Sequence, residues 1–204
     1  MTAEGMTAEG MTAESAGPAA YGLLHADAVA LLRAHTPADS QQEAVRRDML
    51  AHLATHPDAM AKAGPPAHFT ASCLVLDPGL ERVLLTHHRK ADAWFQFGGH
   101  LELSDRSVRA GARREALEES GVEGLTVTPL PVHLDRHELV GTFGRCREHL
   151  DIRYAALAPP EAVPRVSAES VDVRWWPVDS LPGEGGLTRL VELARAAFDE
   201  DAPV

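Results

Sequence analysis

The sequence predicts an α/β fold, specifically an α/β/α sandwich around a mixed sheet, with a helical N-terminal extension. Strand-like segments rich in apolar and β-branched residues are mixed with a few amphipathic helices, without the regular alternation typical of a parallel sheet. Hydrophobic residues make up 45% of the 204 residues and charged residues 24%, which is a globular composition. We therefore expect one folded domain with its own core.

The beginning of this fold is predicted to be helical. Apolar residues recur at helical spacing over 27–34 and 39–55, and the Gly-Pro-Pro at 64–66 ends the helical region. These helices can cap the fold or pair with another subunit, so a homodimer is one arrangement that the sequence allows.

The sheet and two further helices are expected after residue 66. A helix over 107–120 should end at Gly121, where a glycine commonly closes a helix, and a last amphipathic helix is expected over 187–198. Runs of apolar and β-branched residues predict the strands. These runs lie at 69–76, 83–87, 94–97, 125–137 (interrupted by Pro129 and Pro131), 149–157 and 171–176.

The two ends of the chain differ from this body. The N-terminus contains three nearly identical pentads beginning MTAE, a period of neither helix nor strand, and the C-terminus is acidic. We therefore expect four regions along the chain. They are a disordered repeat tail at 1–17, a helical extension at 18–66, a folded domain at 67–198 and an acidic tail at 199–204.

Charge and cysteine content exclude several classes of protein. The chain has 19 Lys and Arg against 30 Asp and Glu, a net charge of −11, so we expect no binding to duplex nucleic acid or to an anionic membrane. Cys73 and Cys146 are too few for a disulfide framework. The N-terminus does not read as a secretory signal, and no apolar run reaches the roughly 18 residues of a membrane span, so we expect a cytoplasmic protein.

An acidic segment within the predicted helix 107–120 indicates metal chemistry. Glu115, Glu118 and Glu119 are spaced i, i+3 and i+4, so a helix projects all three carboxylates from one face, near the end where the helix dipole disfavours negative charge. Hard divalent cations such as Mg²⁺ bind carboxylates together with substrate phosphates. The alternative is a solvated acidic face balanced by Arg113 and Arg114.

The surroundings of these glutamates are more specific than the glutamates alone. The pair Gly98-Gly99 precedes them, and residues 114–122 read Arg-Glu-Ala-Leu-Glu-Glu-Ser-Gly-Val. This segment resembles the signature box of the Nudix hydrolase superfamily, which has a glycine, a glutamate and an Arg-Glu-x-x-Glu-Glu-x-Gly run at fixed spacing. Asp105 stands where the family has glutamate, and eight residues instead of seven separate it from Arg114.

The resemblance implies a metal-dependent pyrophosphohydrolase. The implied reaction is hydrolysis of a diphosphate bond in a nucleoside diphosphate linked to another moiety. Glu115, Glu118 and Glu119 would bind Mg²⁺ or Mn²⁺, and Glu118 is the first candidate for activating the attacking water. Arg114 would complete the catalytic set by orienting a glutamate through an ion pair, shared with Asp105.

The residues just before the box are further candidates. The backbone of Gly98 and Gly99 can pass close to a metal where a Cβ would obstruct, or it can simply form a tight turn. Arg89 and Lys90 form a basic cluster that could meet substrate phosphates, with an exposed hairpin end as the alternative. We group His100 with them as a candidate for substrate binding.

Polar residues outside the box leave alternatives open. Period-two spacing places several His and Asp side chains on one face of neighbouring strands, which suits a second metal site, the wall of a substrate cleft or a solvated surface. Glu169 or Asp151 could also supply a further ligand or a general base. The side chains on the strand face are His133, Asp135, His137, His149 and Asp151.

Two other functional classes share this fold. One is a regulatory module that binds a nucleotide without turnover, and the other is a diphosphate isomerase. The intact Arg-Glu-x-x-Glu-Glu favours catalysis over simple binding, because a binder has no need for three mutually repelling carboxylates. An isomerase would want a cysteine and a glutamate facing an apolar pocket, and neither cysteine has that context.

Overall fold

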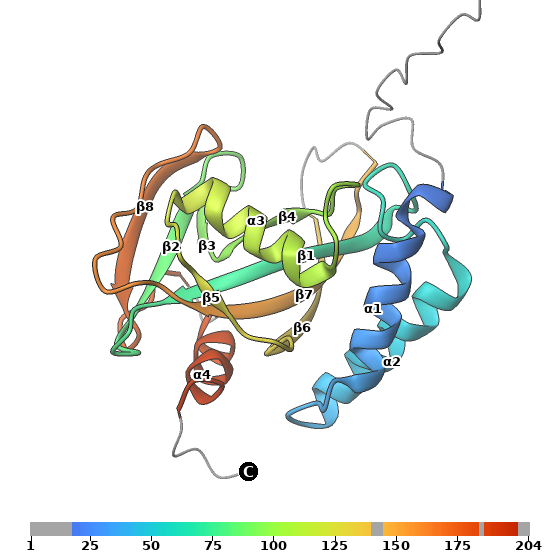
Figure 1. Cartoon of the computed structure of the whole chain (residues 1–204), viewed down its shortest axis with the longest axis horizontal. Helices are drawn as coiled ribbons and strands as arrows, with labels where there is room; N and C mark the ends of the chain where they lie inside the picture. The colour runs from blue at the N-terminus through green and yellow to red at the C-terminus, as the bar shows by residue number, and fades with distance from the viewer. Residues whose placement is uncertain (1–17, 140–144, 184–185, 200–204) are drawn as a thin grey trace, which may run out of the picture.

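The computed structural model of the chain describes residues 18–139, 145–183 and 186–199. Two helices precede the first strand, one helix interrupts the strands, and one follows them (Figure 1). The helical elements are η1 (Pro18–Tyr21), α1 (Gly22–Ala34), α2 (Ser40–Thr55), α3 (Val108–Ser120) and α4 (Thr188–Ala196). The strands are β1 (Ala67–Leu76), β2 (Arg82–His88), β3 (Ala93–Phe95), β4 (Phe97–His100), β5 (Thr126–Val127), β6 (His133–Glu138), β7 (Glu148–Leu157) and β8 (Ser170–Pro177).

The sheet is mixed, as predicted. β1 and β7 run parallel along their whole length, from the pair Ala67 and Glu148 to the pair Leu76 and Leu157. β5 and β6 pair antiparallel with β7, and β2 pairs antiparallel with both β1 and β8. The parallel pair β1–β7 therefore lies in the middle of the sheet, and antiparallel strands are added on both sides of it.

β1 and β2 diverge after a short paired stretch, and this divergence shapes the site. They pair at Val75 with Leu84 and at Leu76 with Val83; further along, β4 pairs with β1 while β3 pairs with β2. The prediction of one strand over 94–97 is therefore wrong. The chain changes partner strand at Gln96, and such a change leaves no mark in a run of four residues.

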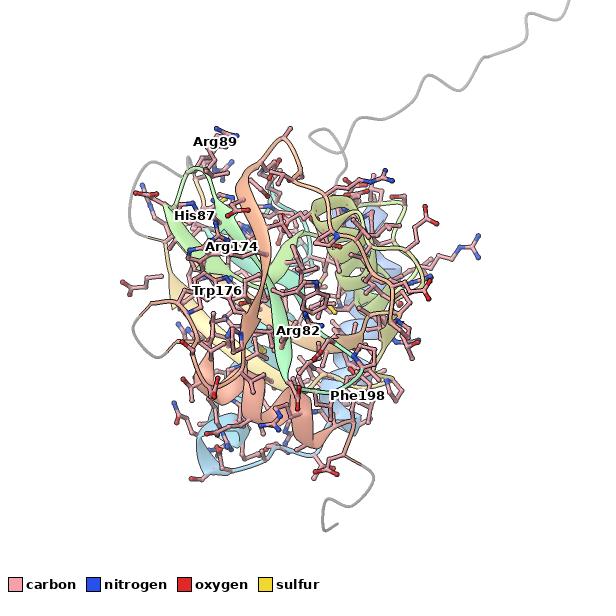
Figure 2. The ribbon with its side chains drawn as sticks, turned by 90° about the vertical axis from the view of Figure 1, so that its left-hand side faces the viewer. Arg82, His87, Arg89, Arg174, Trp176 and Phe198 are labelled. Carbon is pink, nitrogen blue, oxygen red and sulfur yellow. The ribbon has the colours of Figure 1, made fainter. Side chains whose placement is uncertain are left out.

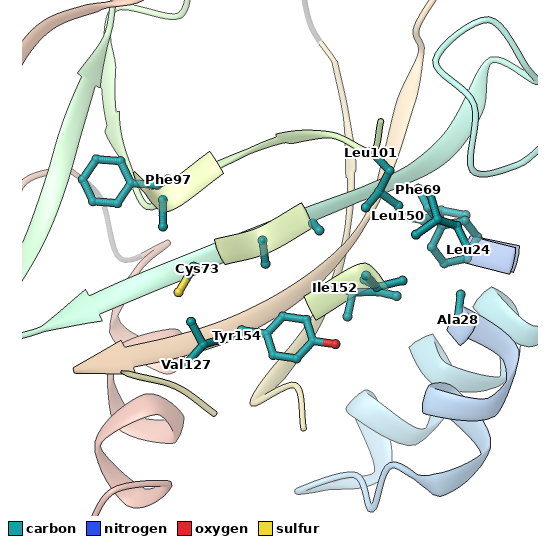
Figure 3. Close-up of a cluster of buried hydrophobic side chains, with 14 of the residues drawn as sticks. Leu24, Ala28, Phe69, Cys73, Phe97, Leu101, Val127, Leu150, Ile152 and Tyr154 are labelled. Carbon is teal, nitrogen blue, oxygen red and sulfur yellow. The ribbon is translucent and has the colours of Figure 1, made fainter. Parts of the chain in front are cut away.

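Two apolar cores lie on opposite faces of the sheet. Because side chains alternate along a strand, Phe69, Ala71 and Cys73 of β1 pack in the core that includes α1 and α3, while Leu74 and Leu76 pack with α4. Figure 1 shows α3 and α4 on opposite sides of the sheet, and Figure 3 shows the first core. The α/β/α sandwich with a helical N-terminal extension is thus confirmed.

The N-terminal helices are joined to the sheet by specific hydrogen bonds. The buried Gln42 side chain of α2 donates to the Leu134 carbonyl (2.9 Å) and accepts from the Leu134 N–H (2.8 Å). These bonds satisfy backbone groups on the outer edge of β6. Asp27 of α1 accepts from the Val108 N–H at the start of α3 (2.8 Å). The extension therefore supports both the sheet edge and the helix that carries the glutamates.

Some predictions about the ends of the chain can be compared with the structure. α1 begins at Gly22 and not at residue 27, because its first turn also buries Leu24. The predicted repeat tail at 1–17 and residues 200–204 of the acidic tail lie outside the described residues. In the part of the chain that the structure describes, no helix is long and apolar enough to cross a membrane.

Replacing Gln42 by alanine should destabilise the fold. Gln42→Ala would leave the N–H and the carbonyl of Leu134 without partners, which should lower the free energy of unfolding by roughly 2–3 kcal/mol in chemical denaturation. Gln41→Ala, at the exposed neighbouring position, is the matched control and should change this free energy by less than about 0.5 kcal/mol. Equal effects of the two substitutions would show that the extension does not depend on this contact.

Candidate active site

The glutamate-bearing helix α3 begins and ends as the sequence predicts. The Ser107 side chain accepts from the Ala110 N–H (3.1 Å), and Gly121 closes the helix in the left-handed conformation with φ 66°. Ala112 and Ala116 are fully buried against the core. The caps and these small buried residues fix the position and rotation of the helix.

The guanidinium of Arg114 is the centre of the site. It binds Asp105 through two parallel bonds, each 3.0 Å long. The same group contacts Glu115 (3.0 Å) and Glu118 (3.1 Å) and donates to the His100 carbonyl (3.0 Å). Burial alone would lower the pKa of Arg114, but the hydrogen bond to Asp105 and the surrounding carboxylates raise it. Arg114 therefore stays charged and joins the preceding loop to the helix.

The aspartate that replaces the expected glutamate fits a tight loop. Asp105 is 9% exposed and also accepts from the Glu102 N–H (2.8 Å). A Cβ added at Gly111 would lie 3.0 Å from the Asp105 carboxylate and 2.5 Å from the Leu101 side chain. The short Asp105 side chain thus reaches Arg114 in the narrow space beside the backbone of α3 at Gly111.

Glycine is required at 98 and 99 because neighbouring atoms lie close to the backbone there. A Cβ at Gly99 would lie 2.7 Å from the nearer carboxylate oxygen of Glu115, and one at Gly98 would lie 2.3 Å from the Ser72 Cβ. Neither glycine has a positive φ. A tight turn with positive φ is therefore not the reason for the two glycines; Gly98 leaves room for Ser72 and Gly99 for the Glu115 carboxylate, and close approach to a metal stays a prediction.

The three glutamates differ in environment. The side chain of Glu118 is 57% exposed and that of Glu115 14%, whereas Glu119 as a residue is 9% exposed. Burial raises the pKa of Glu115 to about 7, against the opposing charge of Arg114. Burial also raises the pKa of Glu119 to about 8, with Glu115 and Glu169 adding to the shift and a hydrogen bond from the Gly98 N–H opposing it.

These environments fit a divalent cation. Glu115 and Glu119 are carboxylates in a region of excess negative charge, and carboxylate oxygens are the ligands that Mg²⁺ and Mn²⁺ prefer. Glu169, which precedes β8, is close enough to raise the pKa of Glu119. Asp151 instead accepts hydrogen bonds from Thr70 (3.1 Å) and other side chains of the sheet. Of the two acids proposed from outside the box, Glu169 is the one beside it.

The structure does not gather the five strand-face residues into one metal site. Arg153 donates to Asp151 (2.9 Å) and to Asp135 (2.6 Å), and Asp135 also contacts His137 (2.7 Å). These acids are therefore neutralised within the sheet. His149 belongs to a different group of ligands, and His133 has a buried Nδ1 without a hydrogen-bond partner.

The candidate phosphate-binding residues are dispersed. Arg89 donates to the Ser170 carbonyl (2.8 Å), which joins the end of β2 to β8, and Lys90 is exposed. Figure 2 shows Arg89 at one end of the β2–β8 ribbon, with Arg174 and Trp176 further along it. The His100 ring points to His68 at 3.0 Å, while its carbonyl faces Arg114.

Two polar groups were not predicted from the sequence. Thr70 and Ser72 (2.7 Å) both donate to Asp151, with Gln96 at 3.4 Å, and so form a buried polar surface beside the box. The alternation of β1 contains a signal for it, since Thr70 and Ser72 recur at period two in an apolar strand. The second group is Arg174 over Trp94 (5.2 Å to the ring centroid), which depends on strand pairing and leaves no local signal.

Comparisons with known proteins show the family to which this chain belongs. The family model described as NUDIX domain matches residues 66–196. Among solved structures, a NUDIX-family hydrolase from Clostridium perfringens is 25% identical, with 65% of this chain and 96% of that chain covered and a TM-score of 0.48. The MutT protein from Methanosarcina mazei Go1 is 17% identical, with 68% and 98% covered and a TM-score of 0.49. No curated protein matches the chain.

A third solved structure is described as a complex with a ligand. The NUDIX domain of Shewanella oneidensis NrtR, complexed with ADP ribose, is 19% identical, with 64% of this chain and 87% of that chain covered and a TM-score of 0.49. The family match extends over more than half of the sequence, so the chain belongs to the NUDIX domain family. The class of enzyme predicted from the box, a Nudix-type pyrophosphohydrolase, is confirmed by this family match.

Replacing Arg114 by lysine should weaken the site although the charge is retained. Lysine cannot form the two parallel bonds to Asp105 while also contacting the glutamates, so Arg114→Lys should lower the free energy of unfolding by roughly 1–3 kcal/mol. Arg113→Lys, at the exposed neighbouring position, should have almost no effect in the same denaturation experiment. If Arg114→Lys left the free energy of unfolding unchanged, the Arg114 guanidinium would not be the group that holds the site together.

The buried Glu119 should make stability depend on pH when metal is absent. Its pKa rises from 4.5 to about 8 on folding, so the associated stability is fully present below pH 4.5 and is lost as pH rises through about 8. With a chelator present, Glu119→Gln should therefore gain stability relative to the native protein between these pH values. Excess Mg²⁺ should reduce that gain. If the difference in stability between Glu119→Gln and the native protein did not change with pH, the Glu119 carboxylate would not be buried as described.

Proposed function

We propose that the protein hydrolyses a diphosphate bond in a nucleoside diphosphate linked to another moiety, with Mg²⁺ or Mn²⁺ as cofactor. The observation that carries this proposal is that Glu115, Glu118 and Glu119 lie together on one face of α3 beside the glycine pair of β4, with Arg114 in contact with Glu115 and Glu118. A solvated acidic face does not account for it, because Glu119 is 9% exposed and its pKa is raised by burial and by neighbouring acids.

The three glutamates have distinct proposed roles. Glu115, Glu118 and Glu119 would hold the cation, which supplies charge neutralisation on the phosphates and activation of water when bound. Glu118 is the most exposed of the three, with a side-chain exposure of 57%, and so can reach a water beside the substrate. It would accept a proton as the water oxygen bonds to one phosphorus and the bond from that phosphorus to the bridging oxygen breaks.

Arg114 acts in this scheme as a positioning residue. Its contacts with Glu115 and Glu118 restrict the rotation of both carboxylates, and its bonds to Asp105 restrict its own. Prearranged charged groups lower the cost of reorganisation when charge develops in the transition state. This supports catalysis by a rigid site and not by a mobile acidic surface.

The substrate is proposed to be a small polar molecule. The buried polar surface of Thr70, Ser72 and Asp151 lies on the strands beside β4, with Gln96 at its border. Because Thr70, Ser72 and Asp151 are at most 4% exposed and bond to one another, the partly exposed Gln96 is the side chain of this surface that can offer its amide to a sugar or phosphate group. The net charge of −11 supports a small-molecule substrate over duplex nucleic acid.

A substrate screen tests the proposal. The protein is incubated with Mg²⁺ or Mn²⁺ and with nucleoside triphosphates, ADP-ribose, dinucleoside polyphosphates, NADH and nucleotide sugars, and the released phosphate products are measured. We expect turnover of at least one compound and its loss when a chelator is added. Glu118→Gln combined with Glu119→Gln should lower kcat by at least about 100-fold.

The matched control is Glu123→Gln, which removes an exposed carboxylate just after α3. It should retain the native kcat and KM. Binding of a nucleotide without turnover would favour the regulatory-module alternative. Turnover that survives the double substitution would contradict the proposed use of the box glutamates.

A further inference from the structure

A second group of metal-binding side chains lies outside the box. Its ligand atoms all lie within 4.8 Å of one another. They come from the beginning of β1, the end of β4 and the chain at the beginning of β7. We call this group the histidine–cysteine cluster, and its members are His68, His100, Cys146 and His149.

Strand pairing brings these residues together. His68 and His149 are directly paired across the parallel strands β1 and β7, and His100 is paired with Thr70, on the face of β1 that also carries His68. The Cys146 segment is fixed by the neighbouring Arg147, whose N–H donates to the Pro66 carbonyl (2.9 Å). Four residues distant in sequence thus converge from ordered backbone.

Two members of the cluster are buried, two are partly exposed, and one buried ring nitrogen has no hydrogen-bond partner. His68 is 1% exposed and Cys146 7%. The Nε2 of His149 is buried and has no hydrogen-bond partner. An unpaired buried polar atom lowers stability. A ligand bound to the His149 Nε2 would remove this loss of stability.

The hydrogen bonds of His68 orient its lone pair toward the cluster. Its Nδ1 lies 3.0 Å from the Pro65 carbonyl, and since a carbonyl only accepts, Nδ1 carries the hydrogen. The Nε2 of neutral His68 then presents a lone pair to the His100 Nε2 at 3.0 Å. A backbone carbonyl bound to the outer nitrogen is the usual arrangement around a metal-binding histidine.

We propose that the histidine–cysteine cluster binds one Zn²⁺ ion in a tetrahedral site. Three imidazoles and one thiolate match the ligand set and number of zinc sites. Ligands of a tetrahedral zinc are separated by about 3.3–3.7 Å, so the observed upper limit of 4.8 Å requires only small side-chain movements. The site would link the beginnings of β1 and β7 to the end of β4.

The site differs from the carboxylate site in ligand chemistry. Nitrogen and sulfur ligands select Zn²⁺ over Mg²⁺, whereas the box glutamates select hard cations. The two are joined through His100, whose ring belongs to the cluster and whose carbonyl accepts from Arg114 (3.0 Å). Zinc would therefore hold the backbone on which the Arg114 network rests.

Cobalt spectroscopy tests the zinc site. The untagged full-length protein is freed of metal and titrated with Co²⁺, which should give tetrahedral d–d bands and a thiolate-to-cobalt charge-transfer band that saturates at one equivalent. Zn²⁺ should displace it. Cys146→Ser should abolish the charge-transfer band, and His149→Gln should weaken Co²⁺ binding by at least about tenfold.

Matched controls separate this site from the proposed catalytic one. Cys73→Ala removes the other cysteine, and Glu118→Gln with Glu119→Gln removes box carboxylates; both proteins should retain the charge-transfer band. The zinc site can thus be present even if no diphosphate is hydrolysed. Absence of the band from the native protein, or its persistence in Cys146→Ser, would overturn the proposal.

A measurement on the native protein avoids the risk that a variant does not fold. Alkylation of Cys146 by iodoacetamide is followed by mass spectrometry with and without Zn²⁺, with the fully buried Cys73 as internal reference. Zinc should slow the modification of Cys146 by at least about tenfold, because the bound thiolate is no longer free to react. Equal rates would overturn the proposal.

Discussion

The site depends on one interaction, the paired hydrogen bonds between Arg114 and Asp105. They connect the loop after β4 to α3, and they place a fixed positive charge among acids that would otherwise repel one another. Glu115 and Glu118 take their positions from the same guanidinium. The glycine pair, the caps of α3 and the N-terminal helices all maintain the geometry in which this contact forms.

The parts of the site that the sequence predicts are those with local signals. The spacing of Glu115, Glu118 and Glu119 identifies one helix face, and Gly121 marks the end of that helix. Family membership, the sandwich fold and the helical extension follow from such signals too. The roles of the individual site residues are not settled by the fold, and they stay predictions.

The parts that the sequence does not predict depend on pairing between distant strands. At Gln96 the chain leaves β2 and pairs with β1, and His68 pairs with His149 across β1 and β7. Both pairings depend on strand register, which cannot be read from the periodicity of side chains along one strand. The same holds for the five strand-face residues, for which the sequence leaves a second metal site, a cleft wall and a solvated surface open. They do not form one shared metal site, because Arg153 of β7 neutralises Asp135, and the histidines that converge are those of β1, β4 and β7.

The two proposed sites would have different tasks, which their chemistry explains. In the proposed function the carboxylate site would bind and release a hard cation together with a phosphorylated substrate, and its Glu118 is exposed. The histidine–cysteine cluster is less exposed and contains nitrogen and sulfur ligands, as the proposed structural zinc ion would require. His100 belongs to both environments, and it makes the position of Arg114 dependent on the strands of the sheet.

Anomalous diffraction from crystals soaked in Mn²⁺ and a non-hydrolysable diphosphate analogue tests the central claim most directly. We predict an anomalous peak in contact with the carboxylates of Glu115, Glu118 and Glu119 and with the diphosphate, while Arg114 remains bound to Asp105. A diphosphate bound elsewhere, or a box without an anomalous peak, would contradict the account.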